Sequence, residues 1–235
     1  MKHLILTLSL ITTVLTSNAQ VKIALTGGLN IASISWKDKD ATNTLIDSAD
    51  YAFGSTKSKQ GFNVALLFEI HTEENFYLET GIGLSKKGGE TRENIKLTPS
   101  GVQFNRTQIF SPTYLQVPAY LIYFPENKRK YKFTAGAGAQ IGFGVGGRYQ
   151  STTFVGTNPK KQVDQPISYG INLNDQFAKI EIGIGAKVGF IISDNLCFGA
   201  SYQRSIINNA PKTMEQLGSA IHSVIGFHIT KFIKR

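Results

Sequence analysis

The feature that most constrains this chain is a strict alternation of apolar residues with residues that are often glycine. Between residues 133 and 145, Phe, Ala, Ile and Val alternate with Thr, Gly and Gln. Between residues 179 and 190, Ile, Ala, Val and Phe alternate with Lys, Glu and Gly. A period of two is typical of β-strands. Glycine weakens a strand, so a glycine-rich face is not explained by exposure to water.

The same period predicts an all-β fold of eight antiparallel strands. They are expected at residues 21–31, 62–70, 76–85, 115–123, 133–145, 179–190, 196–203 and 225–230. The connections are short at 71–75, 125–130 and 193–195, and long at 33–60, 88–110, 146–177 and 206–220. Short turns on one side and long loops on the other are typical of an up-and-down transmembrane β-barrel, with periplasmic turns and extracellular loops.

The glycines also indicate which face lies inside. The interior of an eight-stranded barrel is only wide enough to be filled by side chains, so glycines leave room for a few long polar groups. The apolar face would cause aggregation in water, whereas lipid requires it. Aromatic residues expected near the strand ends on that face are Tyr114, Tyr123, Phe124 and Tyr131.

The opposite phase predicts a polar network inside the barrel. Its members are Lys22, Asn30, Asn63, Glu69, Glu79, Gln116, Lys179, Glu181, Lys187, Gln203 and His228. Charges of both signs in so narrow a space must pair with one another, because an isolated buried charge is costly. The sequence therefore predicts a plugged lumen rather than the lining of a pore.

The N-terminus has the pattern of a secretory signal peptide. A short basic start is followed by an apolar stretch, and Ser17-Asn18-Ala19 supplies small residues ahead of Gln20. We expect residues 1–19 to be removed and residues 20–235 to form one outer-membrane barrel domain. The net charge of +9 is scattered along the chain, which argues against nucleic acid as a partner.

No residues form a convincing catalytic site. His222 with Ser219 or Ser223 is the only constellation worth naming, and a polar residue at the barrel rim explains His222 better. The single cysteine, Cys197, is expected to be a small packed side chain. We expect no enzymatic activity.

Metal and cofactor sites are not expected either. Asp38, Asp40, Asp47 and Asp50 lack the spacing of a calcium loop. The glycines between residues 136 and 147 have a spacing similar to that of phosphate-binding loops, but no helix follows them.

The long connections hold the candidate contact residues. Aromatic residues and arginine are enriched in interfaces, and binding is often carried by loops on a rigid scaffold. The candidates are Tyr51, Phe53, Phe104, Arg106, Arg148, Tyr149 and Phe154, with Phe110 among the same aromatics. The expected partners are outer-membrane lipid and lipopolysaccharide, and a protein bound at the loops or at the periplasmic turns.

Several segments resemble the PorT-type outer-membrane β-barrel family of Bacteroidetes. Residues 114–121 (YLQVPAYL) resemble a strand of that family in which Tyr-Leu precedes an apolar-Pro step, and residues 61–88 resemble its second hairpin. The Asn-Ala-Gln junction at residues 18–20 resembles signal-peptide ends from those bacteria. The resemblance implies a small outer-membrane barrel, and one type of member is implicated in protein secretion and gliding. The chain departs from the usual outer-membrane ending, because Ile233-Lys234-Arg235 follows Phe232.

The expected function is that of a small outer-membrane barrel whose loops have a structural or partner-binding role. We expect this role to be related to secretion or assembly. Two alternatives remain open. One is a small channel or uptake component for polar solutes, and the other is a soluble lipocalin-like barrel that binds a ligand.

Overall fold

The computed structural model describes residues 21–38, 49–73, 75–97, 103–125, 132–155, 158–172, 175–193, 195–210 and 218–233. The predicted signal peptide, Asp40, Asp47 and Tyr131 lie outside these residues. In the part of the chain described, no helix is long and apolar enough to cross a bilayer.

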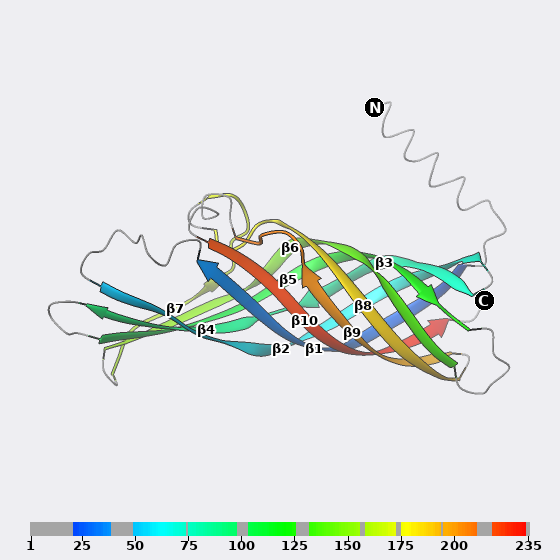
Figure 1. The fold of residues 1–235 in the computed structure, drawn as a ribbon, viewed down its shortest axis with the longest axis horizontal. Helices are drawn as coiled ribbons and strands as arrows, with labels where there is room; N and C mark the ends of the chain where they lie inside the picture. The colour runs from blue at the N-terminus through cyan, green and yellow to red at the C-terminus, as the bar shows by residue number, and fades with distance from the viewer. Residues whose placement is uncertain are drawn as a thin grey trace, which may run out of the picture.

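Ten β-strands make up the structure (Figure 1). They are β1 (Val21–Asp38), β2 (Ala49–Glu73), β3 (Phe76–Lys86), β4 (Gly89–Leu97), β5 (Gln103–Tyr123), β6 (Lys132–Val155), β7 (Asn158–Pro166), β8 (Ile180–Ser193), β9 (Leu196–Ser205) and β10 (Gly218–Ile233). The named strands pair antiparallel throughout.

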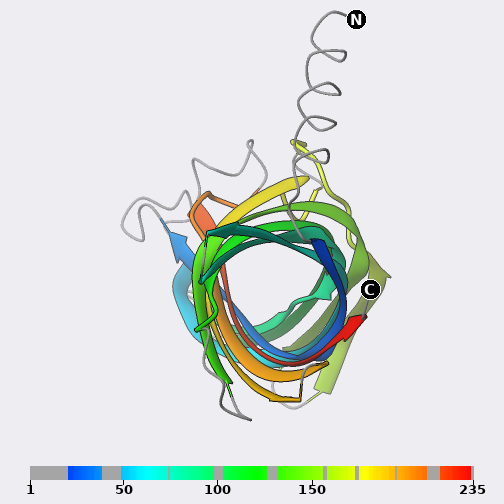
Figure 2. The same ribbon diagram turned by 90° about the vertical axis from the view of Figure 1, so that its right-hand side faces the viewer.

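Eight of these strands close into a ring, in the order β1-β2-β3-β5-β6-β8-β9-β10, and β10 pairs back with β1. Figure 2 shows this ring end-on. Closure leaves no open sheet edge around the ring, which is what a bilayer demands because it offers no hydrogen bonds to backbone groups.

The two ends of the ring differ. At one end β1 begins, β10 ends and short connections join β2 to β3, β5 to β6 and β8 to β9; we call this the turn end. At the other, the extended end, β2, β5 and β6 continue past the ring. There β4 pairs with both β2 and β5, and β7 pairs with β6 (Figure 1).

The extended end corrects the prediction of long loops. Much of the connections predicted at 33–60, 88–110 and 146–177 is strand, so the described residues form ten strands where eight were predicted. These segments escaped the period-two criterion because polar residues occupy both faces, as in β4 with Thr91, Arg92 and Glu93. Backbone hydrogen bonds form the ladder whatever the side chains are.

Side-chain exposure follows the predicted phase. The outward residues of the ring are apolar and exposed, for example Leu29 (68%), Phe133 (57%) and Phe227 (54%). Inward residues such as Glu69, Glu79 and Glu181 are buried. A surface that exposes aliphatic and aromatic side chains while it buries carboxylates matches a solvent of lipid rather than water.

Tyr114 is a correction to that phase assignment. It was predicted among the aromatics of the outer face, yet it is fully buried inside the ring. Because it lies two residues from Gln116 and six from Tyr120, the alternation of β5 itself directs Tyr114 inward.

A β-bulge shifts the phase of β6 near the extended end. Thr113 pairs with Gly146 and Tyr114 with Gly144, so Val145 is the extra residue. Before the bulge the even-numbered residues face inward, and after it the odd-numbered ones do, which turns Tyr149 and Ser151 toward the interior.

Inward glycines allow neighbouring strands to approach closely. A Cβ added at Gly138 of β6 would lie 2.1 Å from the carbonyl oxygen of Ala119 in β5. The Gly138→Val variant should therefore lose about 1–3 kcal/mol of unfolding free energy through overpacking. Ala139→Val, on the exposed outer face of the same strand, is the matched control and should change it little. Urea titration in lipid vesicles measures both, and equal losses would contradict the assignment of the inner face.

Candidate functional site

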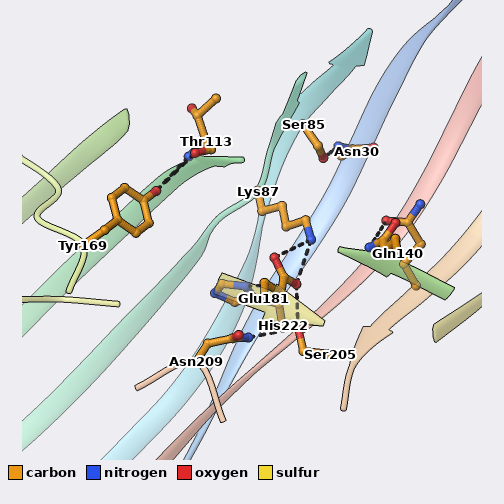
Figure 3. A network of polar contacts seen from close by, with 11 residues as sticks. Asn30, Ser85, Lys87, Thr113, Gln140, Tyr169, Glu181, Ser205, Asn209 and His222 are labelled. Atoms are coloured by element: carbon orange, nitrogen blue, oxygen red, sulfur yellow. Dashed lines mark hydrogen bonds and ion pairs between the residues drawn. The ribbon is translucent and has the colours of Figure 1, made fainter. Parts of the chain in front are cut away.

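The lumen near the extended end is centred on a buried ion pair. Nζ of Lys87, which follows β3, lies 2.8 and 2.9 Å from the two carboxylate oxygens of Glu181 in β8. Ser205 in β9 donates a hydrogen bond of 2.5 Å to the same carboxylate, and Asn209 donates to Ser205 (Figure 3). Both charged side chains are at most 2% exposed. The glutamate is thus neutralised and held from two directions.

His222 and Tyr114 border this ion pair without completing the network. Nδ1 of His222 lies 3.5 Å from a Glu181 oxygen, and neither ring nitrogen makes a hydrogen bond. The Tyr114 hydroxyl is likewise buried without a hydrogen bond. The prediction of His222 as a rim residue was wrong, because the side chain is 1% exposed inside the lumen.

Below this layer lies a polar chamber of about 90 Å³. An ion pair between Lys187 and Glu79 crosses it. Carboxamides supply five of its ten other polar side chains, with Asn63 donating to Asn30 at 2.7 Å and Gln140 donating to Gln203 at 2.9 Å. Its lining comprises Thr26, Asn30, Asn63, Leu67, Glu79, Gly83, Ser85, Gln116, Pro118, Tyr120, Gln140, Lys187, Ser201, Gln203 and His228. A polar cavity of this size has room for several waters.

Near the turn end an apolar cluster lies beside polar and charged side chains of the lumen. Ala24, Leu67, Ile191, Cys197 and Phe232 form a buried cluster there. These side chains belong to the strands of the ring itself. The cavity beside the cluster has a volume of only about 20 Å³.

Lys22 is a half-buried cation at the turn end. Its Nζ lies 4.9 Å from the ring centre of Tyr77 and 5.3 Å from that of Phe124. In the strand register Lys22 stands opposite Glu69, which in turn stands opposite Glu79. Charges of both signs therefore continue toward the apolar cluster.

The extended end is closed by residues 167–172 and 175–179, which we call the cap segment. Ile167 and Phe177 of this segment pack with Ile34, Phe110, Ala210 and Ala220 into a second apolar cluster. The segment is fastened to the residues that follow β9, because the N–H of Ala178 donates to the carbonyl of Asn209 at 2.7 Å. An apolar cluster thus lies near each end of the lumen.

Most of the predicted network residues lie in the lumen. Those buried or half-buried there are Lys22, Asn30, Asn63, Glu69, Glu79, Gln116, Glu181, Lys187, Gln203 and His228. Lys179 is the exception: it precedes β8 and is exposed. The alternation holds only within the paired strand, so counting two residues back from Glu181 placed Lys179 wrongly. Lys87 was missed because it lies beyond the apolar run that revealed β3, although its parity matches Glu79 and Ser85.

The predicted loop contacts lie on strands instead. Tyr51 and Phe53 belong to β2, Phe104 and Arg106 to β5, and Arg148, Tyr149 and Phe154 to β6. Arg106 pairs with Glu93 at 3.6 Å and Arg148 with Asp164 at 2.8 Å. Tyr149 turns inward and packs on Phe110, with 5.0 Å between ring centres.

The arrangement is not that of a hydrolytic triad. The hydroxyl of Ser205 donates to Glu181, which is paired with Lys87, rather than to His222, so Ser205 and His222 do not form the serine–histidine pair of a triad. Ser219 and Ser223 differ in parity from His222 and therefore face the opposite side of β10. Among the described residues, no group of three or more His, Cys, Asp or Glu side chains is placed to hold a metal ion.

The buried Lys87–Glu181 pair leads to a prediction about the free energy of unfolding. Lys87→Met leaves Glu181 uncompensated and should cost about 3–5 kcal/mol of unfolding free energy, whereas Lys87→Met combined with Glu181→Leu should recover most of it. The exposed Arg148–Asp164 pair is the control, and Arg148→Met should cost no more than about 1 kcal/mol. Urea unfolding in vesicles distinguishes the two sites. Equal losses for the single variants would show that the Lys87–Glu181 pair contributes nothing special.

A carboxylate organises the cap segment. Asp175 accepts hydrogen bonds from the Ser168 hydroxyl at 2.5 Å and from the Asn172 N–H at 2.8 Å, and these hold the pKa of Asp175 below its usual range. With a lower pKa in the folded state, this stabilisation is complete above the unfolded pKa of about 4 and is lost as pH falls through the folded value.

Amide hydrogen exchange of residues 167–172 should therefore show less protection at pH 3 than at pH 5, after correction for intrinsic exchange rates. In Asp175→Asn, protection should already be low at pH 5 and should not fall further. A pH profile shared by the parent and the variant would refute the role of Asp175.

Several solved structures are similar to this chain at low sequence identity. No curated protein matches the chain. Among solved structures, OprG of Pseudomonas aeruginosa shares 12% identity with a TM-score of 0.41, covering 92% of this chain and 98% of that chain. Neisserial surface protein A shares 12% identity with a TM-score of 0.40, covering 90% and 98%. Ail of Yersinia pestis shares 11% with a TM-score of 0.34, covering 91% and 99%.

A family model covers most of the sequence. Residues 16–210 match the family described as outer membrane protein beta-barrel domain. The chain belongs to that family, and it is a protein of the outer membrane.

Proposed function

We propose that this protein is a non-conducting barrel that serves as a binding platform on the outer membrane. The observation that carries the proposal is the closure of the lumen at successive levels. From the extended end these are the apolar cap, the Lys87–Glu181 pair, the polar chamber and the apolar cluster around Phe232. Such a lumen supports a plug better than a conducting pore.

In this proposal the turn end faces the periplasm and the extended end faces outward, in keeping with the orientation of bacterial barrels. Export would use the predicted signal peptide at residues 1–19. The apolar belt contacts lipid, and exposed cations near the extended end, such as Lys179 and Arg204, lie where lipopolysaccharide phosphates would meet them.

The partner-binding surface is the sheet that projects beyond the ring. Its described strands run in the order β2-β4-β5-β6-β7, so β7 and residues 49–58 of β2 form its two edges. The β7 edge carries the exposed residues Lys161 and Pro166, and lysine and proline are residues that protect sheet edges against the addition of another strand. Residues 49–58 contain no proline, and this edge is the one that we assign to a protein partner.

The resemblance to PorT-type barrels supports a partner that acts in secretion or assembly. We also infer that the protein is not an enzyme, since Ser205 and His222 both approach Glu181 and neither activates the other.

Planar-bilayer recording tests the plug. The purified protein should give no stable conductance steps, because side chains fill the lumen, with an apolar cluster near each end and ion pairs between the clusters. Insertion is verified independently by the heat-dependent gel shift of folded barrels and by protease protection. Steady conductance from inserted protein would overturn the proposal and favour a channel or uptake component for polar solutes.

The platform is tested by shortening one hairpin at a time. Replacing residues 90–109 by a short turn removes β4 and the end of β5, which should abolish crosslinking of the partner on intact cells. The matched control shortens residues 150–164, at the guarded edge, and should leave the same crosslinked species in place. Loss in the control alone would place the partner on β7 instead.

A further inference from the structure

The cap segment is a folded unit in its own right. The N–H of Gly170 donates to the carbonyl of Phe177 at 3.0 Å, and that of Gln176 donates to the carbonyl of Ser168 at 3.0 Å. The Asp175 carboxylate joins the two arms through Ser168 and Asn172. Because these bonds lie within the segment, it can keep its shape without the wall of the ring.

Its attachment to the wall centres on one side chain. The hydroxyl of Tyr169 donates to the carbonyl of Gly146 at 2.7 Å and accepts from the N–H of Thr113 at 3.2 Å (the latter contact appears in Figure 3). Its ring fills a notch at Gly144, where an added Cβ would lie 2.2 Å from the ring. Two backbone hydrogen bonds join the ends of the segment to β6: the N–H of Ile167 donates to the carbonyl of Gly147, and the N–H of Gly144 donates to the carbonyl of Lys179.

The cap segment covers polar groups that have no hydrogen bond. The Phe177 ring lies 5.2 Å from that of His222, and the Tyr169 ring lies 5.7 Å from that of Tyr114. The nitrogens of His222 and the hydroxyl of Tyr114 are buried without a hydrogen bond, and the Glu181 carboxylate lies 3.5 Å from Nδ1 of His222. Buried polar atoms without partners oppose the closed state, and lifting the segment would let water or a ligand satisfy them.

Beneath the cap segment lies the layer of Lys87 and Glu181, and below that layer lies the polar chamber. Ser85, Gln116 and Gln203, which line it, are the next inward residues below Lys87, Tyr114 and Ser205 on their strands. Each of the two ion pairs, Lys87–Glu181 and Lys187–Glu79, is neutral as a pair. The carboxamides both donate and accept hydrogen bonds. The interior therefore suits neither a cation nor an anion.

We propose that the cap segment is a lid, and that lifting it turns the lumen into a blind pocket, open at the extended end, for a small uncharged hydrophilic molecule with hydroxyl or amide groups. The cluster of Leu67, Ile191 and Phe232 belongs to the ring strands and stays closed, so the pocket does not conduct. This site goes beyond the platform role and does not depend on it.

Thiol labelling tests both the lid and the ligand class. Ser201, which lines the chamber, is changed to cysteine in a Cys197→Ser background, and the protein is studied in detergent micelles. The probes are hydroxyethyl methanethiosulfonate and its trimethylammonium and sulfonate counterparts. The neutral probe should react, and each charged probe should react at least about tenfold more slowly.

Tyr169→Phe removes the fastening hydroxyl and should raise the rate of neutral labelling about tenfold. Gly144→Ala, which displaces the Tyr169 ring from its notch, should also raise it. The matched control is Tyr123→Phe on the outer face, which should leave the rate unchanged. The gel shift confirms that each variant is folded.

An unchanged rate in folded Tyr169→Phe and Gly144→Ala would overturn the lid, and equal rates for all three probes would overturn the ligand class. Conductance of the same variants is a separate readout. If Tyr169→Phe labels faster and remains silent in a planar bilayer, lid and plug both stand. Conductance would overturn the blind pocket, whereas conductance of the parent protein alone bears on the proposed function.

Discussion

The structure depends on the narrow interior of a ring of eight strands. Lipid outside the ring forces apolar side chains outward, and closure satisfies the backbone. What remains is a space too small for large residues on every strand. Glycines such as Gly138 and Gly185, where an added Cβ would fall within 2.6 Å of the neighbouring backbone, set how closely the strands approach. The polar side chains of the lumen therefore have to fit into a space whose width the glycines set.

The same limit explains why Glu79 and Glu181 are each paired with a lysine, whereas Glu69, also buried, has a carboxylate oxygen without a hydrogen bond. A single buried carboxylate would lack compensation, and a water-filled pore to solvate it does not fit beside so many inward side chains. Lys87 meets Glu181, and Lys187 meets Glu79, each pair joining strands that are not neighbours in the ring. These contacts cross the lumen and therefore brace the ring as well as fill it.

The ring strands and the orientation of their side chains could be predicted from the sequence, because in lipid the apolar residues of each strand face outward and the polar ones face inward. The parity of Glu69, Glu79 and Glu181 follows from apolar neighbours alone, and the ring of eight strands follows from the same runs. Parity fails where the apolar runs stop. Lys87 and His222 lie past them, Lys179 precedes its paired strand, and a bulge at Val145 changes the phase of β6.

The strands of the extended end could not be predicted for a related reason. Outside the bilayer both faces of β4 and β7 are polar, so hydrophobicity carries no period there, and the pairing rests on backbone hydrogen bonds that every sequence can form. The cap segment is harder still. Its contacts, such as Tyr169 with Gly144, join residues that no local pattern relates.

The two closures of the lumen differ in a way that matters for function. At the turn end the seal consists of Ile191, Cys197 and Phe232, side chains of strands β8, β9 and β10, so opening it would require the ring to separate. At the extended end the seal is a segment between β7 and β8 that has its own internal hydrogen bonds. The proposed lid therefore opens without separating any strand pair of the ring. In that proposal the protein changes what it presents to the outside while the ring keeps the membrane sealed.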